Sequence, residues 1–459
     1  MELTPKKIYE DFFNKIIDKV SAIEQLSTLI ENSNNINIRV KSIEYLEKIG
    51  KIGDNSNNKE ENLFNLFENL LISDSSDKIR NIAATFLKTN FLEKSFEPMI
   101  WALHHESSPN CLKVIFESLI GIINQSIKKE DDISKVNLFN KIKQINEKAF
   151  RIDIELWCEG KQEDEITIKE IAEILINYFC LIYLQKTVWR LKFSIENCRI
   201  VQLDFIFKGL TKLPEAIKHL NSLKVLILRY NQLTILPDWI GSLNSLESLN
   251  LNVNNIIELP KTIGSLTSLK ELLLWKNELN FLPDSIGLMI SLEKLNLRLN
   301  QLIELPSNFG NLSYLKELNL HDNKLVSIPE TIGSLSSLEI LNLSWNELKK
   351  IPNTIGALSS LKSLDLERNE LLSIPLSIGN LSSLKVLNLS DNKLKKIPKT
   401  LGNLKNLEIL NLSRNNITEL PETIKLLTSL KEIYLGENNF KSIPRDLKEL
   451  ERKGLKIFY

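Results

Sequence analysis

The chain has little cysteine, and none of it is arranged in pairs. Its 459 residues contain Cys111, Cys158, Cys180 and Cys198, without a CxxC spacing. This usage predicts buried free thiols in a reducing compartment. No stretch approaches the ~18 apolar residues of a membrane span, and no apolar run follows the first basic residues. We therefore expect no membrane span, no secretory signal and a cytoplasmic location.

An excess of charge of either sign is also missing. The formal net charge is +0, residues 1–199 carry 27 basic and 31 acidic side chains, and the remainder carries 31 and 27. Proteins that hold nucleic acid through its phosphates need a basic excess. We therefore expect no nucleic-acid partner.

Motifs of catalysis and of cofactor binding are missing as well. The sequence has neither a GxxxxGK[ST] nor a GxGxxG phosphate-binding loop. His104-His105 has no further ligand at metal spacing, and we interpret it as the polar end of a helix. His321 and Asp322 are neighbours whose side chains diverge on a strand, with no nucleophile beside them. The sequence predicts no enzyme, no cofactor and no metal site.

What the chain does have is a period of 23 residues. An asparagine recurs at this spacing, at Asn231, Asn254, Asn277, Asn300, Asn323, Asn346, Asn369, Asn392, Asn415 and Asn438. A proline follows six residues after each asparagine, and Pro214 continues the series one step earlier. A fixed period of this length predicts one supersecondary unit stacked on its copies, which is a solenoid.

Each unit predicts a short strand followed by a turn and a return segment. The alternation in Leu318-Asn319-Leu320 is that of a strand with one buried face, and successive units place their strands side by side and parallel. The asparagines should form a ladder of side-chain hydrogen bonds to the backbone of their own turn and the next. Proline makes the return segment extended or 3₁₀-like. The glycines at Gly241, Gly264, Gly287, Gly310, Gly333, Gly356, Gly379 and Gly402 suit a tight turn with φ > 0.

The repeated pattern LxxLxLxxNxLxxLPxxIGxLxx over residues 200–452 resembles the leucine-rich repeat superfamily. Its spacing and its Leu/Ile-Pro-x-x-Ile-Gly signature are similar to the intracellular Ras-group subclass. The resemblance implies a curved solenoid of eleven repeats, with a parallel β-sheet on the concave face that binds proteins. Relatives that bind small GTPases or phosphatase subunits make these two classes candidate partners.

Recognition should depend on the two residues before each asparagine, which vary most along the predicted concave face. Trp, Tyr and Arg dominate interface hot spots. The alternative interpretation is that these positions face solvent and vary in residue type without a binding role. The candidate partner-binding residues are Arg229, Tyr230, Trp275, Lys276, Arg298, His321, Asp322, Trp345, Glu367 and Arg368.

A second variable row, from Lys224 and Glu247 to Lys431, presents opposite charges on most neighbouring strands. Opposite charges on adjacent strands attract and like charges repel. We interpret this row as a device for register and solubility rather than as a binding surface.

Residues 1–185 lack the repeat and predict helices. The segment from Asp77 to Leu87 resembles the second helix of a HEAT repeat, and the segment from Asn37 to Leu46 is a weaker copy. A helical bundle without repeats is the alternative. Residues 186–199 predict a β cap before the solenoid, and 453–459 a capping strand behind it.

The sequence thus predicts an α+β repeat protein, with a HEAT-like α-helical domain followed by the solenoid. As a function it predicts a non-enzymatic scaffold for protein–protein interaction. The alternative is a regulatory or sensor subunit that binds a peptide or small ligand between the helical domain and the first repeats.

Overall fold

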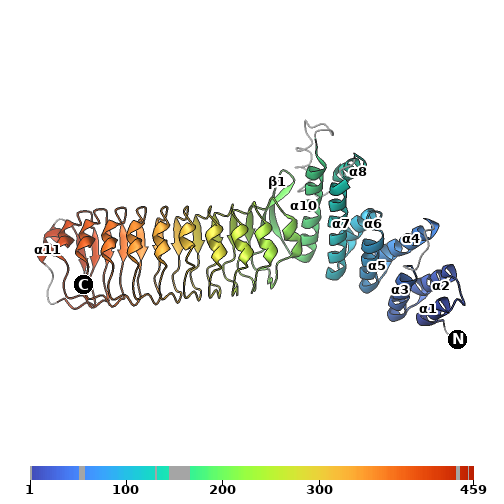
Figure 1. Cartoon of the computed structure of the whole chain (residues 1–459), viewed down its shortest axis with the longest axis horizontal. Coiled ribbons are helices and arrows are strands. Elements are labelled where there is room, and N and C mark those ends of the chain that lie inside the picture. Colours follow the sequence, from blue (N-terminus) through green and yellow to red (C-terminus); the bar gives the residue numbers. More distant parts are fainter. Residues whose placement is uncertain (1–2, 51–56, 130–131, 144–165, 441–444, 453) are drawn as a thin grey trace. The chain divides into compact units, whose positions relative to one another are not determined.

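The computed structural model describes residues 3–50, 57–129, 132–143, 166–440, 445–452 and 454–459. Cys158, Pro444 and position 453 of the predicted capping strand lie outside these residues. The chain forms two compact units, Met1–Trp189 and Arg190–Tyr459, so the division falls four residues after the predicted boundary at 185. Figure 1 shows a helical unit and a solenoid, which we describe separately.

The helical unit consists of antiparallel helix pairs. Helix α2 packs on α3, α4 on α5, and α6 on α7, while α10 packs on α6, α7 and α8. Helix α1 begins at Pro5 behind the capping side chain of Thr4. The helices are α1 (Pro5–Phe13), α2 (Lys19–Asn32), α3 (Ile36–Gly50), α4 (Asn57–Ser73), α5 (Asp77–Asn90), α6 (Phe96–His105), α7 (Pro109–Lys129), α8 (Asp132–Lys143) and α10 (Ile168–Thr187).

Two ion pairs link successive helix pairs in the same way. Arg39 of α3 donates to both carboxylate oxygens of Asp74, which lies in the turn between α4 and α5. Arg80 of α5 donates to Glu106, in the turn between α6 and α7, over 2.7 Å from Nε and 2.9 Å from Nη2. Each arginine lies near the start of the second helix of its pair. The assignment of this unit to the HEAT class remains a prediction.

The solenoid is built on a 13-stranded sheet in the described residues, and its strands follow one another in chain order. Apart from the antiparallel pair β1–β2, neighbouring strands are parallel. The strands are β1 (Lys192–Glu196), β2 (Arg199–Asp204), β3 (Val225–Ile227), β4 (Ser248–Asn250), β5 (Glu271–Leu273), β6 (Lys294–Asn296), β7 (Glu317–Asn319), β8 (Ile340–Asn342), β9 (Ser363–Asp365), β10 (Val386–Asn388), β11 (Ile409–Asn411), β12 (Glu432–Tyr434) and β13 (Lys456–Phe458).

The return segment of each coil before the last is a short 3₁₀ helix, as the prolines predict. These helices are η2 (Glu215–His219), η3 (Asp238–Ser242), η4 (Lys261–Ser265), η5 (Asp284–Leu288), η6 (Phe309–Asn311), η7 (Glu330–Ser334), η8 (Asn353–Ala357), η9 (Leu376–Asn380), η10 (Lys399–Asn403) and η11 (Glu422–Leu426). The leucines and isoleucines of the pattern fill the space between strand and return segment. In one coil Leu318, Leu320, Leu325, Ile332 and Leu335 are all fully buried.

The asparagine ladder is present, but each member bonds to the coil before its own rather than the one after it. Asn323 donates from Nδ2 to the carbonyl of Leu320 in its own turn and to that of Leu297 in the preceding coil. Its Oδ1 accepts the backbone N–H of Leu302, also in the preceding coil. The same three kinds of bond recur along the stack, so each side chain ties two coils together.

The prediction that the repeated glycines need φ > 0 is wrong. Among the described glycines only Gly209 and Gly454 have positive φ. The eight repeated glycines instead lie where one coil presses on the next. A Cβ built on any of them would come within 2.1 to 2.7 Å of a backbone carbonyl oxygen in the following coil. They are glycines because of close packing between coils.

Both ends of the solenoid are closed by strands that depart from the repeat. At the start, β1 pairs antiparallel with β2, and β2 pairs parallel with β3. At the end, helix α11 (Arg445–Arg452) precedes β13, which pairs parallel with β12. Leu447, Leu450 and Leu455 of this last segment are buried. Each end of the sheet therefore continues into a strand outside the repeat, and the last segment adds three buried leucines to the core.

Candidate protein-binding surface

The strands set which side chains point outward on the concave face. In β3 the side chain of Leu226 is buried and those of Val225 and Ile227 are half-buried, and every later strand up to β12 repeats this alternation with one face in the core. The predicted pairs, such as Arg229-Tyr230, do not lie on the strand as expected. They occupy the turn that follows it, at the edge of the sheet where each strand ends.

The second residue of each pair has a left-handed backbone. From Tyr230 to Glu437 this residue has φ between 51° and 59° in all ten coils. The side chain therefore leaves the turn in nearly the same direction in every coil. The sequence did not predict this turn, because residues such as Val253 and Trp345 rarely adopt φ > 0.

The outward strand positions themselves were not among the predicted site residues, although the LxL alternation marks them. The third residue of each strand from β3 to β12 forms one row of these positions, and most members of the row are asparagines. Its members are Ile227, Asn250, Leu273, Asn296, Asn319, Asn342, Asp365, Asn388, Asn411 and Tyr434. Asn319 shows their common geometry, because its Oδ1 accepts the backbone N–H of His321 over 3.0 Å. This bond fixes the chain where it leaves the strand, directly below the candidate residues.

A group of side chains in mutual contact surrounds Trp345 on the concave face. The guanidinium carbon of Arg368 lies 3.8 Å from the centroid of the indole ring, and the ring of His321 lies 5.9 Å away on the preceding coil. His321 Nδ1 is 2.7 Å from the hydroxyl of Ser344, which donates to Asn342 over 2.6 Å. Trp345 stays 40% exposed. The structure therefore brings three predicted residues together on neighbouring coils.

Trp275, Lys276 and Arg298 form a second part of the surface, towards the start of the solenoid. The indole N–H of Trp275 is buried and has no acceptor among the described residues. Its backbone N–H donates to Asn252. Lys276 and Arg298 are exposed and make no ion pair with the residues that the structure describes. Both cations are thus available to an acidic partner.

At the first coils, Tyr230 stacks on Phe207 with ring centroids 4.4 Å apart, and the Arg229 guanidinium lies 5.6 Å from the tyrosine ring. Phe207 is 71% exposed and was not predicted as a site residue. The 23-residue spacing from Tyr230 places it in the same row, so the sequence did contain that signal.

The charges of the concave face change sign along the solenoid. Arg229, Lys276 and Arg298 belong to its first coils, whereas Asp322, Asp365, Glu367 and Asp391 follow in the middle, with Arg368 beside Glu367. Burial raises the pKa of the Asp365 carboxyl, and the hydrogen bond from the Glu367 backbone opposes this effect. Burial, with the positive charge of Arg298, lowers the pKa of His321. The first coils and the middle coils thus differ in the sign of most of their exposed charges.

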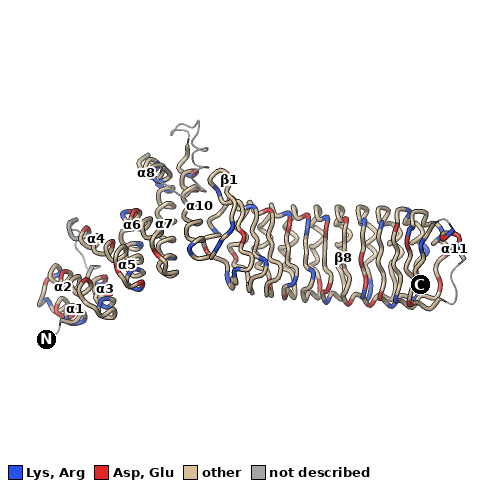
Figure 2. The backbone as a smooth tube through the Cα atoms, turned by 180° about the vertical axis from the view of Figure 1, so that it is seen from behind, with Lys and Arg blue, Asp and Glu red and all other residues tan. Residues whose placement is uncertain are grey.

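The row from Lys224 to Lys431 lies beside this surface, and its charges pair across neighbouring coils as predicted. Lys270 is 2.7 Å from Glu247, Lys316 is 2.6 Å from Glu293, and Lys362 is 2.7 Å from Glu339. Figure 2 shows acidic and basic positions mixed along the solenoid. Because these charges satisfy one another, the row presents little uncompensated charge to solvent.

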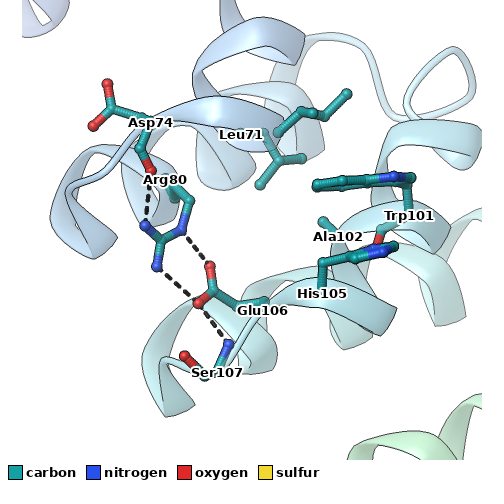
Figure 3. Close-up of a pocket in the computed structure, with 9 residues that line it drawn as sticks. Leu71, Asp74, Arg80, Trp101, Ala102, His105, Glu106 and Ser107 are labelled. Atoms are coloured by element: carbon teal, nitrogen blue, oxygen red, sulfur yellow. Dashed lines mark hydrogen bonds and ion pairs between the residues drawn. The ribbon is translucent and has the colours of Figure 1, made fainter.

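The helical unit has a pocket of about 270 Å³ at the turn that contains Glu106 (Figure 3). Its polar groups are already occupied. Arg80 holds Glu106 and the carbonyl of Asp74, while His105 stacks on Trp101 with ring centroids 4.0 Å apart. Burial would raise the pKa of the Glu106 carboxyl, but hydrogen bonds from Arg80, Ser108 and Ser107 outweigh burial and lower it to about 2. The ion pair between Arg80 and Glu106 thus joins the helix pair α4–α5 to the pair α6–α7.

His104 and His105 form the end of α6, as predicted. Within the described ranges no three His, Cys, Asp or Glu side chains gather as a metal site. Across the same part of the chain, no helix is both long and apolar enough to cross a bilayer.

Comparison with protein-family models matches the leucine-rich repeat region over residues 190–301, 303–389 and 376–452. The chain therefore belongs to the leucine-rich repeat family. A comparison with curated proteins finds no match.

Among solved structures, a TDR receptor is 30% identical with a TM-score of 0.52, over 56% of this chain and 46% of that one. A leucine-rich repeat protein of Leptospira interrogans is 30% identical over 55% of this chain and 82% of its own, with a TM-score of 0.35. The plant peptide hormone receptor RGFR1, in complex with RGF2, is 30% identical with a TM-score of 0.48, over 57% of this chain and 47% of that one. The chain spans less than half of either receptor.

Proposed function

We propose that this chain is a non-enzymatic interaction protein that captures a protein partner on the concave face of its solenoid. The group formed by His321, Trp345 and Arg368 is the observation that carries this proposal. Their contacts fix an exposed tryptophan and an arginine, the residue types that dominate hot spots, before any partner arrives. A surface ordered in advance loses little conformational entropy on binding.

The size and charge of the concave face support the same function. Seven coils, from that of Arg229 to that of Arg368, span ~30 Å at ~4.8 Å per strand, which suits an interface of ~800 Å² per partner. The change from basic to acidic side chains along this span favours a folded partner with the opposite polarity. The TDR receptor, to which this solenoid is similar, is itself a binding protein by its name.

The finer part of the proposal concerns the class of partner. The resemblance to Ras-group repeats makes small GTPases and phosphatase subunits the first candidates to test. The proposed place of the interaction is the cytoplasm, in keeping with the buried free thiols of Cys111, Cys180 and Cys198. Fractionation of cells that express the tagged chain tests the location.

The test of function is affinity capture from cell extract followed by mass spectrometry. A variant that combines Trp275→Ala, Arg298→Ala and Trp345→Ala should lose specific partners and keep the thermal midpoint of the wild type. Trp239→Ala is the matched control, since this tryptophan lies in η3 on the return segment. An unchanged set of captured proteins in the triple variant would remove the concave face from consideration.

A further inference from the structure

A second surface lies on the return side of the solenoid, from the segment that follows the asparagine ladder to the first residues of the 3₁₀ helices η9 and η10. It covers the coils of Asn346, Asn369 and Asn392. Its two leucines, Leu372 and Leu376, are 61% and 68% exposed. We call it the basic–aliphatic patch, and it consists of Lys349, Lys350, Leu372, Leu376, Lys395 and Lys399.

The 23-residue period places the two leucines among the lysines. Residues one period apart lie side by side on adjacent coils, ~4.8 Å apart at the level of the sheet. Leu372 therefore lies between Lys349 and Lys395, and Leu376 lies next to Lys399. The coil of Asn369, which exposes the two leucines, thus has a coil with exposed lysines on each side.

The lysines of the patch differ from most others on the solenoid because they lack partners. Lys349, Lys350, Lys395 and Lys399 make no ion pair with any residue in the described ranges. Two neighbouring lysines do have partners: Lys393 is 3.3 Å from Glu370, and Lys396 is 3.7 Å from Glu419. Four positive charges therefore remain uncompensated around the leucines.

A groove of about 410 Å³ adjoins the patch. Ser373, Ile374, Ile397, Pro398, Leu420 and Pro421 line it, with Lys396, Lys399 and Glu419 at its borders. Its volume lies within the ~300–1,000 Å³ of ordinary ligand pockets, and its apolar lining suits a hydrophobic side chain. The groove gives an anchor point next to unpaired positive charge.

We propose that the basic–aliphatic patch docks an acidic segment of a partner protein. One aliphatic or aromatic side chain of that segment occupies the groove, and carboxylates beside it face the four unpaired lysines. Charge complementarity selects an acidic occupant. A hollow bordered by Glu419 fits a peptide better than the flat anionic surface of a membrane. This surface is separate from the concave face, so one chain holds two partners or two regions of one partner.

The probe is a fluorescein-labelled peptide of alternating Asp and Glu with one central leucine, titrated with the full chain and followed by fluorescence anisotropy. We expect binding that weakens at high salt, because the charges are exposed. Combining Lys349→Glu, Lys395→Glu and Lys399→Glu should weaken it about tenfold or more. Leu372→Ser with Leu376→Ser should weaken it roughly several-fold.

Two matched controls occupy equivalent positions in a distant coil. Lys261→Glu corresponds to Lys399→Glu, and Ile257→Ser corresponds to Leu372→Ser. Both should bind the peptide like the wild type, and so should the triple alanine variant of the concave face. That last result separates this proposal from the one above.

Three results would overturn the proposal. The first is an acidic peptide that fails to bind, and the second is an equal loss of binding in the Lys261→Glu control. The third is binding to vesicles of phosphatidylserine and phosphatidylcholine that the three lysine substitutions abolish, which would identify the patch as a membrane-binding surface instead.

Discussion

The asparagine side chain of one interior coil, Asn323, makes three hydrogen bonds, and all of them join buried backbone groups. In Asn323→Ala the carbonyls of Leu297 and Leu320 and the N–H of Leu302 lose these bonds. The two carbonyls keep a hydrogen bond from Asn300 and Asn346, whereas the N–H of Leu302 is left without a partner. A buried group without a partner costs ~1–3 kcal/mol, so we expect a loss of about 2 kcal/mol in the free energy of unfolding. Urea denaturation measures it.

Asn319→Ala is the control for this prediction, because it removes an asparagine from the same coil whose Oδ1 accepts one bond near the surface. A loss of about 1 kcal/mol or less is expected there. Equal losses in the two variants would contradict the ladder.

The repeated glycines lead to a prediction of steric origin. A Cβ at position 333 would lie 2.4 Å from the carbonyl oxygen of Thr354. Gly333→Ala must therefore separate two coils, and we expect a loss of roughly 2 kcal/mol or more in unfolding free energy. Gly121→Ala serves as the control, since its nearest neighbour would be 3.6 Å away and alanine favours helix α7 by up to ~1 kcal/mol. A stable Gly333→Ala protein would refute the close-packing explanation.

How far the sequence predicts a residue's role depends on whether that role is local. That Asn323 ties two coils through its side chain, and the φ of each proline, follow from the residue type. Which neighbouring coil Asn323 bonds to does not. The role of Gly333 depends on Thr354 in another coil, and the sequence does not show how closely two coils approach. The contact between Trp345 and Arg368 follows from their spacing of one period. The orphaned indole N–H of Trp275 does not.

At the scale of the helices, the ion pair between Arg80 and Glu106 connects one helix pair to the next. The folded-state pKa of Glu106, about 2, lies below the ordinary value of 4.5. A depressed carboxyl pKa stabilises the fold above the unfolded pKa, and that stabilisation is lost as the pH falls towards the folded pKa. We therefore expect the helical unit to lose stability between about pH 5 and pH 2.

Glu106→Gln should remove much of this pH dependence and, at neutral pH, cost ~3 kcal/mol, because Arg80 stays partly buried without its partner. Amide hydrogen exchange in α5 and α7 reports the local stability. Glu117→Gln breaks the exposed pair with Lys88, and we expect ~1 kcal/mol or less. If the wild-type helical unit is as stable at pH 3 as at pH 7, the lowered pKa of Glu106 does not contribute to its stability.

At the scale of the whole molecule, the solenoid tolerates the loss of a complete coil better than that of half a coil. Deletion of residues 279–301 removes one period of 23 and rejoins coils with matching strands and asparagines. Since each coil contacts only its neighbours, stability is roughly a sum over coils and their interfaces. We expect a folded protein whose thermal midpoint, followed by circular dichroism, falls by only a few degrees.

Deletion of residues 279–289 is the matched comparison, because it removes Pro283 and η5 and leaves strand β6 without its return segment. This variant should lose cooperative unfolding. If both deletions unfold alike, the coils are not independent units.

The left-handed residue that precedes each asparagine bears on how this molecule acquires new specificities. Ten coils place a side chain other than glycine in a conformation that costs about 1 kcal/mol apiece, and glycine would relieve all of it. Each coil offers one fixed direction of projection and a free choice of chemical group. Single substitutions in this row can therefore change which protein is recognised while the backbone geometry is inherited unchanged.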